Sequence, residues 1–138
     1  MAILAWSNRF ETGIPAIDTQ HKQLFQSVND LSDSLRRGDP KSEVSRVLDF
    51  LISYTVEHFR TEETWMKNHG FPGLGEHKVE HAKLVAEVSQ LKHRFDAGEL
   101  MTMRVTIFLA NWLKQHINES DLAYVEHSKQ QSLVGAAR

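Results

Sequence analysis

The stretch His58-Phe-Arg-Thr-Glu62 decides the fold, because it places two polar groups on the buried face of a helix. Residues four apart on an α-helix lie on one face, rotated by about 40°, so His58 and Glu62 point the same way. Leu48, Leu51 and Thr55 lead to them at three- and four-residue steps. Burying an imidazole or a carboxylate without a partner is costly. The stripe therefore predicts that both groups meet further ligand-type side chains, or a metal ion, inside the protein.

Three other stretches show the same spacing of apolar residues, which indicates further amphipathic helices. The first is expected to begin at Asp18, which would serve as its N-cap. The four helices are expected to end at Gly38-Asp39-Pro40, at Asn68-His69-Gly70, near Gly98 and just after His116. Gly13 and Pro15 interrupt any helix before Asp18, so residues 1–17 are expected to form an irregular arm packed on the helices.

Four helices joined by short loops should pack antiparallel, as an up-down-up-down four-helix bundle of the all-α class. We predict a single domain over residues 1–138, with the arm at 1–17, the bundle at 18–118 and a C-terminal segment at 119–138. That last segment is expected to contain a short helix from residue 121 to about residue 131.

The composition excludes several classes of function. A net charge of -2 gives no basic surface for nucleic acid or for an anionic membrane. The chain has no cysteine, so disulfides and cysteine nucleophiles are excluded, and any metal must be held by nitrogen and oxygen. No segment predicts a signal peptide or a membrane span, so we expect a cytoplasmic protein without membrane insertion. Eight histidines, in contrast, point to metal binding.

The histidines of the buried stripes all fall at one end of the predicted bundle. In this topology the start of the first helix, the end of the second, the start of the third and the end of the fourth meet. The candidate ligands at these positions are His21, His58, Glu62, His77, His81 and His116. Asp121 lies five residues after His116, a rotation of about 140°, and joins them only if the helix ends or distorts between the two.

Five imidazoles and two carboxylates are too many ligands for one ion and suit two. With no soft ligand in the set, iron or manganese is favoured over zinc, which prefers about four ligands. Two six-coordinate ions offer about twelve positions, and this set with one bridging oxygen leaves roughly one open. One open position suits a small diatomic ligand. The chain also lacks the Glu-x-x-His motifs of ferritin-like di-iron proteins, so we expect binding rather than turnover.

These ligands and their flanking sequences resemble those of the hemerythrin family, in particular the bacterial single-domain bacteriohemerythrins. The resemblance runs from about Trp6 to about His127 and includes Gly13-Ile-Pro-Ala-Ile-Asp-Thr-Gln-His21 and Trp112-Leu-Lys-Gln-His116-Ile117. It implies a four-helix bundle holding two non-haem iron ions, oxo- or hydroxo-bridged, that bind O2 reversibly. By the same resemblance, His77, His81 and His116 ligate the coordinatively full iron, His21 and His58 ligate the iron with the open position, and Glu62 and Asp121 bridge the two.

The resemblance also implies which apolar residues surround the bound O2. They are Leu24, Phe59, Trp112, Leu113 and Ile117, each adjacent to a candidate ligand or about one helical turn from one. A dry pocket of this kind should slow the release of reduced oxygen species, and hence autoxidation.

We therefore expect a protein that is not an enzyme and that binds O2 for carriage, storage or delivery to an oxygen-consuming enzyme. The alternatives are a sensor or scavenger of O2 or NO, and a di-iron oxidase or peroxidase. The sequence shows no long exposed apolar stripe that demands a partner, so we expect a monomer.

Overall fold

The computed structural model describes residues 3–121, 123 and 126–127, which form an all-α fold without β-strands. Its four main helices are α1 (Pro15–Arg36), α2 (Lys41–Asn68), α3 (Leu74–Asp96) and α4 (Met103–Gln115). A short 3-10 helix, η1 (Asn8–Phe10), precedes α1, and a π-helical turn, η2 (His116–Asp121), follows α4 directly. The predicted all-α class with four main helices is confirmed.

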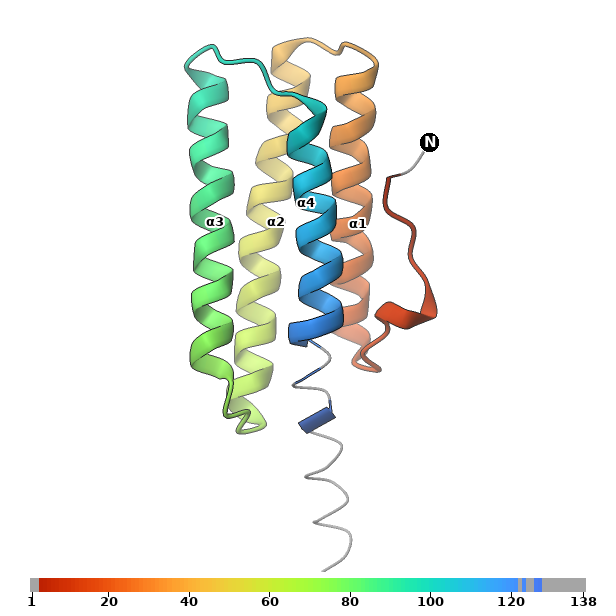
Figure 1. Cartoon of the computed structure of the whole chain (residues 1–138), viewed down its shortest axis with the longest axis vertical. Coiled ribbons are helices and arrows are strands. Elements are labelled where there is room, and N and C mark those ends of the chain that lie inside the picture. The colour runs from red at the N-terminus through yellow and green to blue at the C-terminus, as the bar shows by residue number, and fades with distance from the viewer. Residues whose placement is uncertain (1–2, 122, 124–125, 128–138) are drawn as a thin grey trace, which may run out of the picture.

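Successive helices run in opposite directions, so the bundle has the predicted up-down-up-down topology (Figure 1). α1 packs against α2 and α4, and α2 packs against α3. The α1–α2 and α3–α4 connections lie at the upper end in Figure 1, and the α2–α3 connection lies at the lower end. The start of α1, the end of α2, the start of α3 and the end of α4 therefore share the lower end.

The chain reverses direction within few residues because three helices end in the same glycine-containing motif. After α1, Gly38 has a φ of 68°, a left-handed conformation that glycine adopts at little cost. Its amide donates to the carbonyl of Leu35 at 3.2 Å, and the amide of Asp39 donates to the carbonyl of Ser34 at 3.1 Å. This pair of bonds is a Schellman motif. Gly70 and Gly98 repeat it after α2 and α3, where the sequence predicted the helix ends.

Most apolar side chains of the helices meet in a main core in the middle and the upper end of the bundle, and Ile17 and Met66 form a smaller apolar cluster at the lower end. Leu31 of α1 and Leu48 of α2 have no exposed surface in the main core. Full burial of a leucine side chain contributes about 1.5–3 kcal/mol. The core therefore fixes the helices against one another, and the polar side chains buried at the lower end are held on a rigid frame.

The start of α1 differs from the prediction. The helix begins at Pro15, three residues before the expected N-cap Asp18, because proline fits the first helical position, where its missing N–H is not needed. Asp18 lies in the first turn instead. Its carboxylate accepts hydrogen bonds from the amide and the hydroxyl of Thr12, both at 2.8 Å, and from the amide of Gly13 at 3.2 Å. Asp18 thus ties the arm to the helix.

The rest of the N-terminal arm lies along α1 and is held there by one buried side chain. Asn29 of α1 accepts hydrogen bonds at its Oδ1 from the amides of Ile3 and Leu4, both at 3.0 Å. Its Nδ2 donates to the carbonyl of Leu4 at 2.9 Å. Phe10 of the arm packs edge-on against Phe25 of α1, with ring centroids 5.1 Å apart. The arm is therefore an ordered part of the packed structure.

The expected C-terminal helix lies mostly outside the described residues. Beyond Asp121 the structure describes Ala123, Glu126 and His127, which are helical. Across the described part of the chain, none of the helices combines the length and the apolar character that crossing a membrane requires.

Candidate metal centre

All seven candidate ligands come together at the lower end of the bundle. Their ligand atoms form two groups in which all atoms lie within 4.8 Å of one another. One group contains Glu62, His77, His81, His116 and Asp121, and the other contains His21, His58, Glu62 and Asp121. We call them the three-histidine half and the two-histidine half. Glu62 and Asp121 belong to both, so the two halves share their carboxylates.

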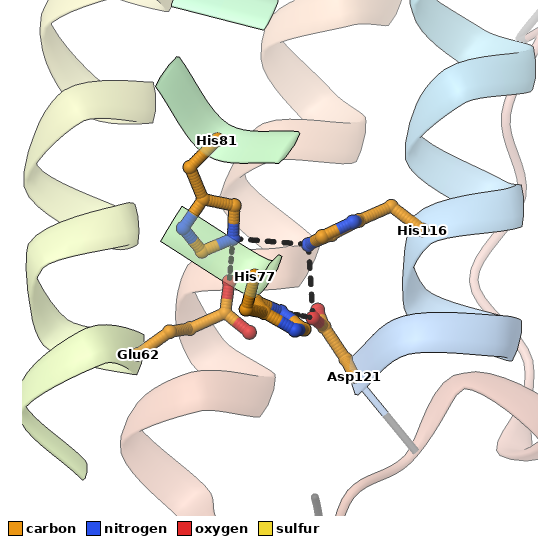
Figure 2. A group of neighbouring side chains, drawn as sticks. All are labelled: Glu62, His77, His81, His116 and Asp121. Carbon is orange, nitrogen blue, oxygen red and sulfur yellow. Dashed lines mark hydrogen bonds and ion pairs between the residues drawn. The ribbon is translucent and has the colours of Figure 1, made fainter. Parts of the chain in front are cut away.

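The three-histidine half is built from α2, α3 and the π-helical turn η2 that follows α4 (Figure 2). Asp121 Oδ1 lies 2.7 Å from His77 Nε2 and 2.9 Å from His116 Nε2. His81 Nε2 lies 3.1 Å from His116 Nε2 and 3.7 Å from Glu62 Oε1. Three Nε2 atoms and two carboxylate oxygens thus face one small volume.

The two-histidine half uses residues of α1 and α2 together with the same carboxylates. His21 Nε2 lies 3.0 Å from Asp121 Oδ2 and 3.9 Å from Glu62 Oε2, and His58 Nε2 lies 2.8 Å from Glu62 Oε1. Asp121 therefore turns Oδ1 toward one half and Oδ2 toward the other. That is the disposition of a carboxylate that bridges two ions.

Asp121 reaches the cluster because the chain changes helix type at His116. In an α-helix, residues five apart point in different directions, but η2 is a π-helix, whose i to i+5 pattern brings them back into line. The sequence predicted that Asp121 could join only if the helix ended or distorted in this segment. The π-turn is that distortion.

Burial and charge set the protonation states of the cluster. All seven side chains are almost fully buried, with at most 5% of their surface exposed. Burial lowers the pKa of His81 to about 3, so its ring is neutral at pH 7. Burial lowers the pKa of His116 too, but the carboxylates of Asp121, Glu62 and Glu80 together outweigh burial and raise that pKa overall. Burial raises the pKa of Asp121, but His116, His21 and His77 together outweigh burial and hold the pKa well below the ordinary value. Asp121 is therefore ionised.

The outer nitrogens of three rings are occupied, which leaves the inner nitrogens for a ligand. The Nδ1 atoms lie 2.8 Å from Gln20 Oε1 for His58, 2.9 Å from Glu63 Oε2 for His81 and 3.4 Å from Glu80 Oε2 for His116. The hydrogen bonds of His58 and His81 fix the proton on Nδ1 and turn the Nε2 lone pair inward, and Glu80 places a negative charge near the outer nitrogen of His116.

Some of the inner atoms are hydrogen-bonded to each other, namely His77 Nε2 with Asp121 Oδ1 and His81 Nε2 with His116 Nε2, but others are not. Despite their short separations, His21 Nε2, His58 Nε2 and Asp121 Oδ2 make no hydrogen bond of ordinary geometry within the described part of the chain. Buried polar atoms are normally hydrogen-bonded, so such a cluster points to a cation. Imidazole nitrogen and carboxylate oxygen are donors that iron accepts, and the residues present therefore fit an iron pair.

The outer partners Gln20, Glu63 and Glu80 were not predicted from the sequence. Each directly precedes or follows a candidate ligand in the chain. That adjacency was the available signal. It is weak, because charged and amide residues are common on helix surfaces, and neighbours along a helix point about 100° apart.

An apolar cavity of about 30 Å³ adjoins the cluster on the side of the core. Four of the five residues expected around O2 line it: Leu24, Phe59, Trp112 and Leu113. Ile117 is fully buried but is not among the lining residues. Phe59 stacks on the ring of His81 with centroids 3.7 Å apart, and Trp112 stacks on His116 at 4.5 Å. The cavity is thus separated from the ligands by single side chains.

Comparison with known proteins gives one family, both from a family model and from individual relatives. Residues 12–127 match the family model described as the hemerythrin HHE cation binding domain. A bacteriohemerythrin of Methylococcus capsulatus (strain Bath) is 40% identical over 126 residues, which cover 90% of this chain and 95% of that protein. A bacteriohemerythrin of Pseudomonas aeruginosa is 36% identical over 126 residues, covering 91% and 82%.

The fold matches a solved structure as well. The crystal structure of a wild-type hemerythrin superimposes with a TM-score of 0.86 at 38% identity, covering 91% of this chain and 97% of that one. Hemerythrins bind a di-iron centre, and the histidine and carboxylate cluster described above is able to hold metal ions. The family is also consistent with binding of O2 by non-haem iron. On the family match and on these identities, the chain belongs to the hemerythrin family.

Proposed function

We propose that this chain is a single hemerythrin-like domain that binds O2 reversibly, for carriage, storage or delivery to an oxygen-consuming enzyme. The observation that carries the proposal is the pair of histidine groups that share two carboxylates beside an apolar cavity. A site with two ions and one adjoining dry space suits a ligand that is small, apolar and able to accept two electrons.

The proposal assigns a role to each of the seven side chains. His77, His81 and His116 would hold one iron, His21 and His58 would hold the other, and Glu62 and Asp121 would serve both. The separate use of Asp121 Oδ1 and Oδ2 by the two halves supports this assignment. Iron ions held there would supply the electrons that O2 binding requires.

The difference between the halves supports a binding position on one side. The two-histidine half offers one protein donor fewer than the three-histidine half, so its ion has room for one more ligand. Leu24 follows His21 by about one turn, Phe59 directly follows His58, and both line the apolar cavity. Apolar side chains from α1 and α2 therefore lie close to both histidines of this half along the chain.

The same surroundings favour binding over turnover. The cavity has room for one or two molecules of the size of water, since about 10–15 Å³ suffices for one. Its lining carries one hydroxyl group, that of Thr55, which donates to the carbonyl of Leu51 at 2.6 Å. The lining therefore offers a second substrate neither space nor an available acid or base.

An optical spectrum taken with the iron content through anaerobic reduction and return to air tests the proposal. We expect about two irons per chain, a colourless reduced form and a charge-transfer spectrum that returns with air over repeated cycles. A reduced form that passes directly to the oxidised spectrum while consuming O2 would overturn reversible binding in favour of an oxidase.

A further inference from the structure

The outer nitrogens of the histidines have carboxylate partners in one half of the site and an amide partner in the other. In the three-histidine half, His81 Nδ1 donates to Glu63 Oε2 at 2.9 Å, and His116 Nδ1 lies 3.4 Å from Glu80 Oε2. In Figure 2 the outer nitrogen of His81 points away from the cluster, toward the side of α2. A negative charge therefore stands behind two of the three rings of this half.

The two-histidine half has neutral partners within the described residues. His58 Nδ1 donates to the amide oxygen of Gln20 at 2.8 Å. The other end of that amide is fixed, because Gln20 Nε2 donates to Thr61 Oγ1 at 3.2 Å and Thr61 donates in turn to the carbonyl of Glu57. His21 Nδ1 is buried and has no hydrogen-bond partner in the described part of the chain. Among the residues that the structure describes, no carboxylate accepts a hydrogen bond from either Nδ1.

This difference acts on the metal through the ring. A carboxylate that accepts the Nδ1–H bond makes the imidazole a stronger donor at Nε2, and a stronger donor stabilises the more highly charged ion. An amide oxygen has the same effect to a smaller degree, because it carries no net charge. Glu63 should contribute more than Glu80, because its contact is shorter and its side chain is 27% exposed against 50% for Glu80.

We propose that Glu63, assisted by Glu80, is a positioning residue that stabilises the higher oxidation state of the iron in the three-histidine half. The iron in the two-histidine half is then the first of the pair to be reduced. The inference rests on the proposed di-iron function and adds an order of reduction to it. Gln20 holds His58 in place without adding charge, so it leaves the iron in the two-histidine half the easier one to reduce.

Two charge-changing variants test this inference in opposite directions. Glu63→Gln keeps the size and the hydrogen-bonding shape of the side chain but removes its charge. Gln20→Glu adds a charge behind His58. Both positions are partly exposed, so both changes are tolerable in the fold. Glu87→Gln on the exposed surface of α3, seven residues after Glu80, is the matched control.

The measurement is a stepwise reduction of the oxidised protein at an electrode, followed by its optical spectrum. At a fixed potential, we expect Glu63→Gln to raise the ratio of reduced to oxidised protein about tenfold in the second one-electron step. The same ratio in the first step should stay unchanged. Gln20→Glu should lower the ratio of reduced to oxidised protein in the first one-electron step and leave that of the second step unchanged. Chelator competition should show iron retained about tenfold less tightly in Glu63→Gln. Glu87→Gln should match the wild-type protein in all three measurements.

The outcomes separate this inference from the proposed function. A general loosening of the site would shift both variants in the same direction, and that result would overturn the role of Glu63. A change in the first one-electron step of Glu63→Gln would also overturn this role, because Glu63 would then act on the other iron. A wild-type protein that binds no redox-active iron pair would overturn the proposed function together with the inference, and iron content distinguishes that case at the outset.

Discussion

Asp121 Oδ1 lies 2.9 Å from His116 Nε2 although the two residues are five apart in the chain. The π-turn that starts at His116 makes this contact, because an α-helix would direct the two side chains about 140° apart. The same turn lets Asp121 Oδ2 reach His21 of α1 at 3.0 Å. One irregular turn therefore joins the two halves of the site.

Asp121→Asn should cost the protein one of its two irons. The amide keeps the shape of the side chain, but it replaces an oxygen that faces one half with an uncharged NH2 group and removes the charge that both halves share. We expect the iron content to fall from about two per chain to one or less, with the helical content preserved. Asp96→Asn, at the opposite end of α3, is the control and should retain two. Full iron loading of Asp121→Asn would contradict the bridging role.

Leu113→Ala should retain iron but shorten the lifetime of the oxygenated form. Leu113 lines the apolar cavity, and its truncation admits water to a space that the wild-type protein keeps dry. The loss of a buried leucine also costs about 2–5 kcal/mol of stability. Leu31→Ala, in the upper core, should cost a similar amount without affecting the site. Autoxidation followed optically should accelerate severalfold in Leu113→Ala alone, and equal rates in both variants would count against the pocket assignment.

Asn29→Ala should release the N-terminal arm from α1. The asparagine side chain pairs with the backbone of Ile3 and Leu4, and each buried group left unpaired costs about 1–3 kcal/mol. We expect a loss of about 2–3 kcal/mol in urea unfolding, and faster proteolysis within the first ten residues. Asn111→Ala, on the exposed face of α4, is the control and should change neither. A stable, protease-resistant Asn29→Ala protein would mean that the arm is held by its aromatic side chains alone.

The four-helix architecture could be predicted because its signals are local and repeated. Apolar residues at three- and four-residue steps mark each helix, and Gly38, Gly70 and Gly98 mark where three of them end. The up-down topology then follows from short connections, and it brings His21, His58 and the later histidines to one end without any knowledge of tertiary contacts.

The remaining features depend on tertiary contacts or on irregular backbone, which periodicity does not report. The contact between Asn29 and the arm joins residues about 25 positions apart, and nothing in the pattern of α1 distinguishes this asparagine from a surface one. Pro15 was interpreted as a helix breaker, yet it opens α1, because the same residue is favourable at a first turn and unfavourable inside a helix. The π-turn at His116 was required by the ligand geometry, but the sequence could not prove it.

The loop between α1 and α2 should make stability depend on pH at the acidic end. A hydrogen bond from Arg37 and another from Ser34 hold the pKa of Asp39 below its ordinary value of 3.8. A carboxyl group whose pKa is lower in the folded state stabilises the protein above the unfolded-state pKa, and this contribution is lost as the pH falls through the folded-state pKa. The free energy of unfolding of Asp39→Asn should therefore be lower than that of the wild type at pH 7, and this difference should shrink as the pH falls below 3.8. Urea unfolding of both proteins from pH 7 into the acidic range measures this difference in the free energy of unfolding. A difference that does not change with pH would assign the effect to packing.

Removal of iron should loosen the lower end of the bundle before the rest. The seven candidate ligands are buried at that end, whereas Leu31 and Leu48 pack in the apolar core above it. A ligand present at 100 times its dissociation constant stabilises the folded state by about 2.7 kcal/mol, so chelation should lower the midpoint of thermal unfolding.

The loss of stability on removal of iron should also be local, and hydrogen exchange can measure it amide by amide. Amides of the π-turn and of the adjoining turns of α2 and α3 should exchange faster after chelation, because the cation that holds the polar side chains together is gone. Amides around Leu31 and Leu48 should keep their protection, since their packing does not involve the site. Asp121→Asn, which is expected not to hold the iron pair, should respond much less to the chelator. Uniform acceleration along all four helices would instead mean that the metal controls the stability of the whole bundle, and that the apolar core alone does not hold the fold.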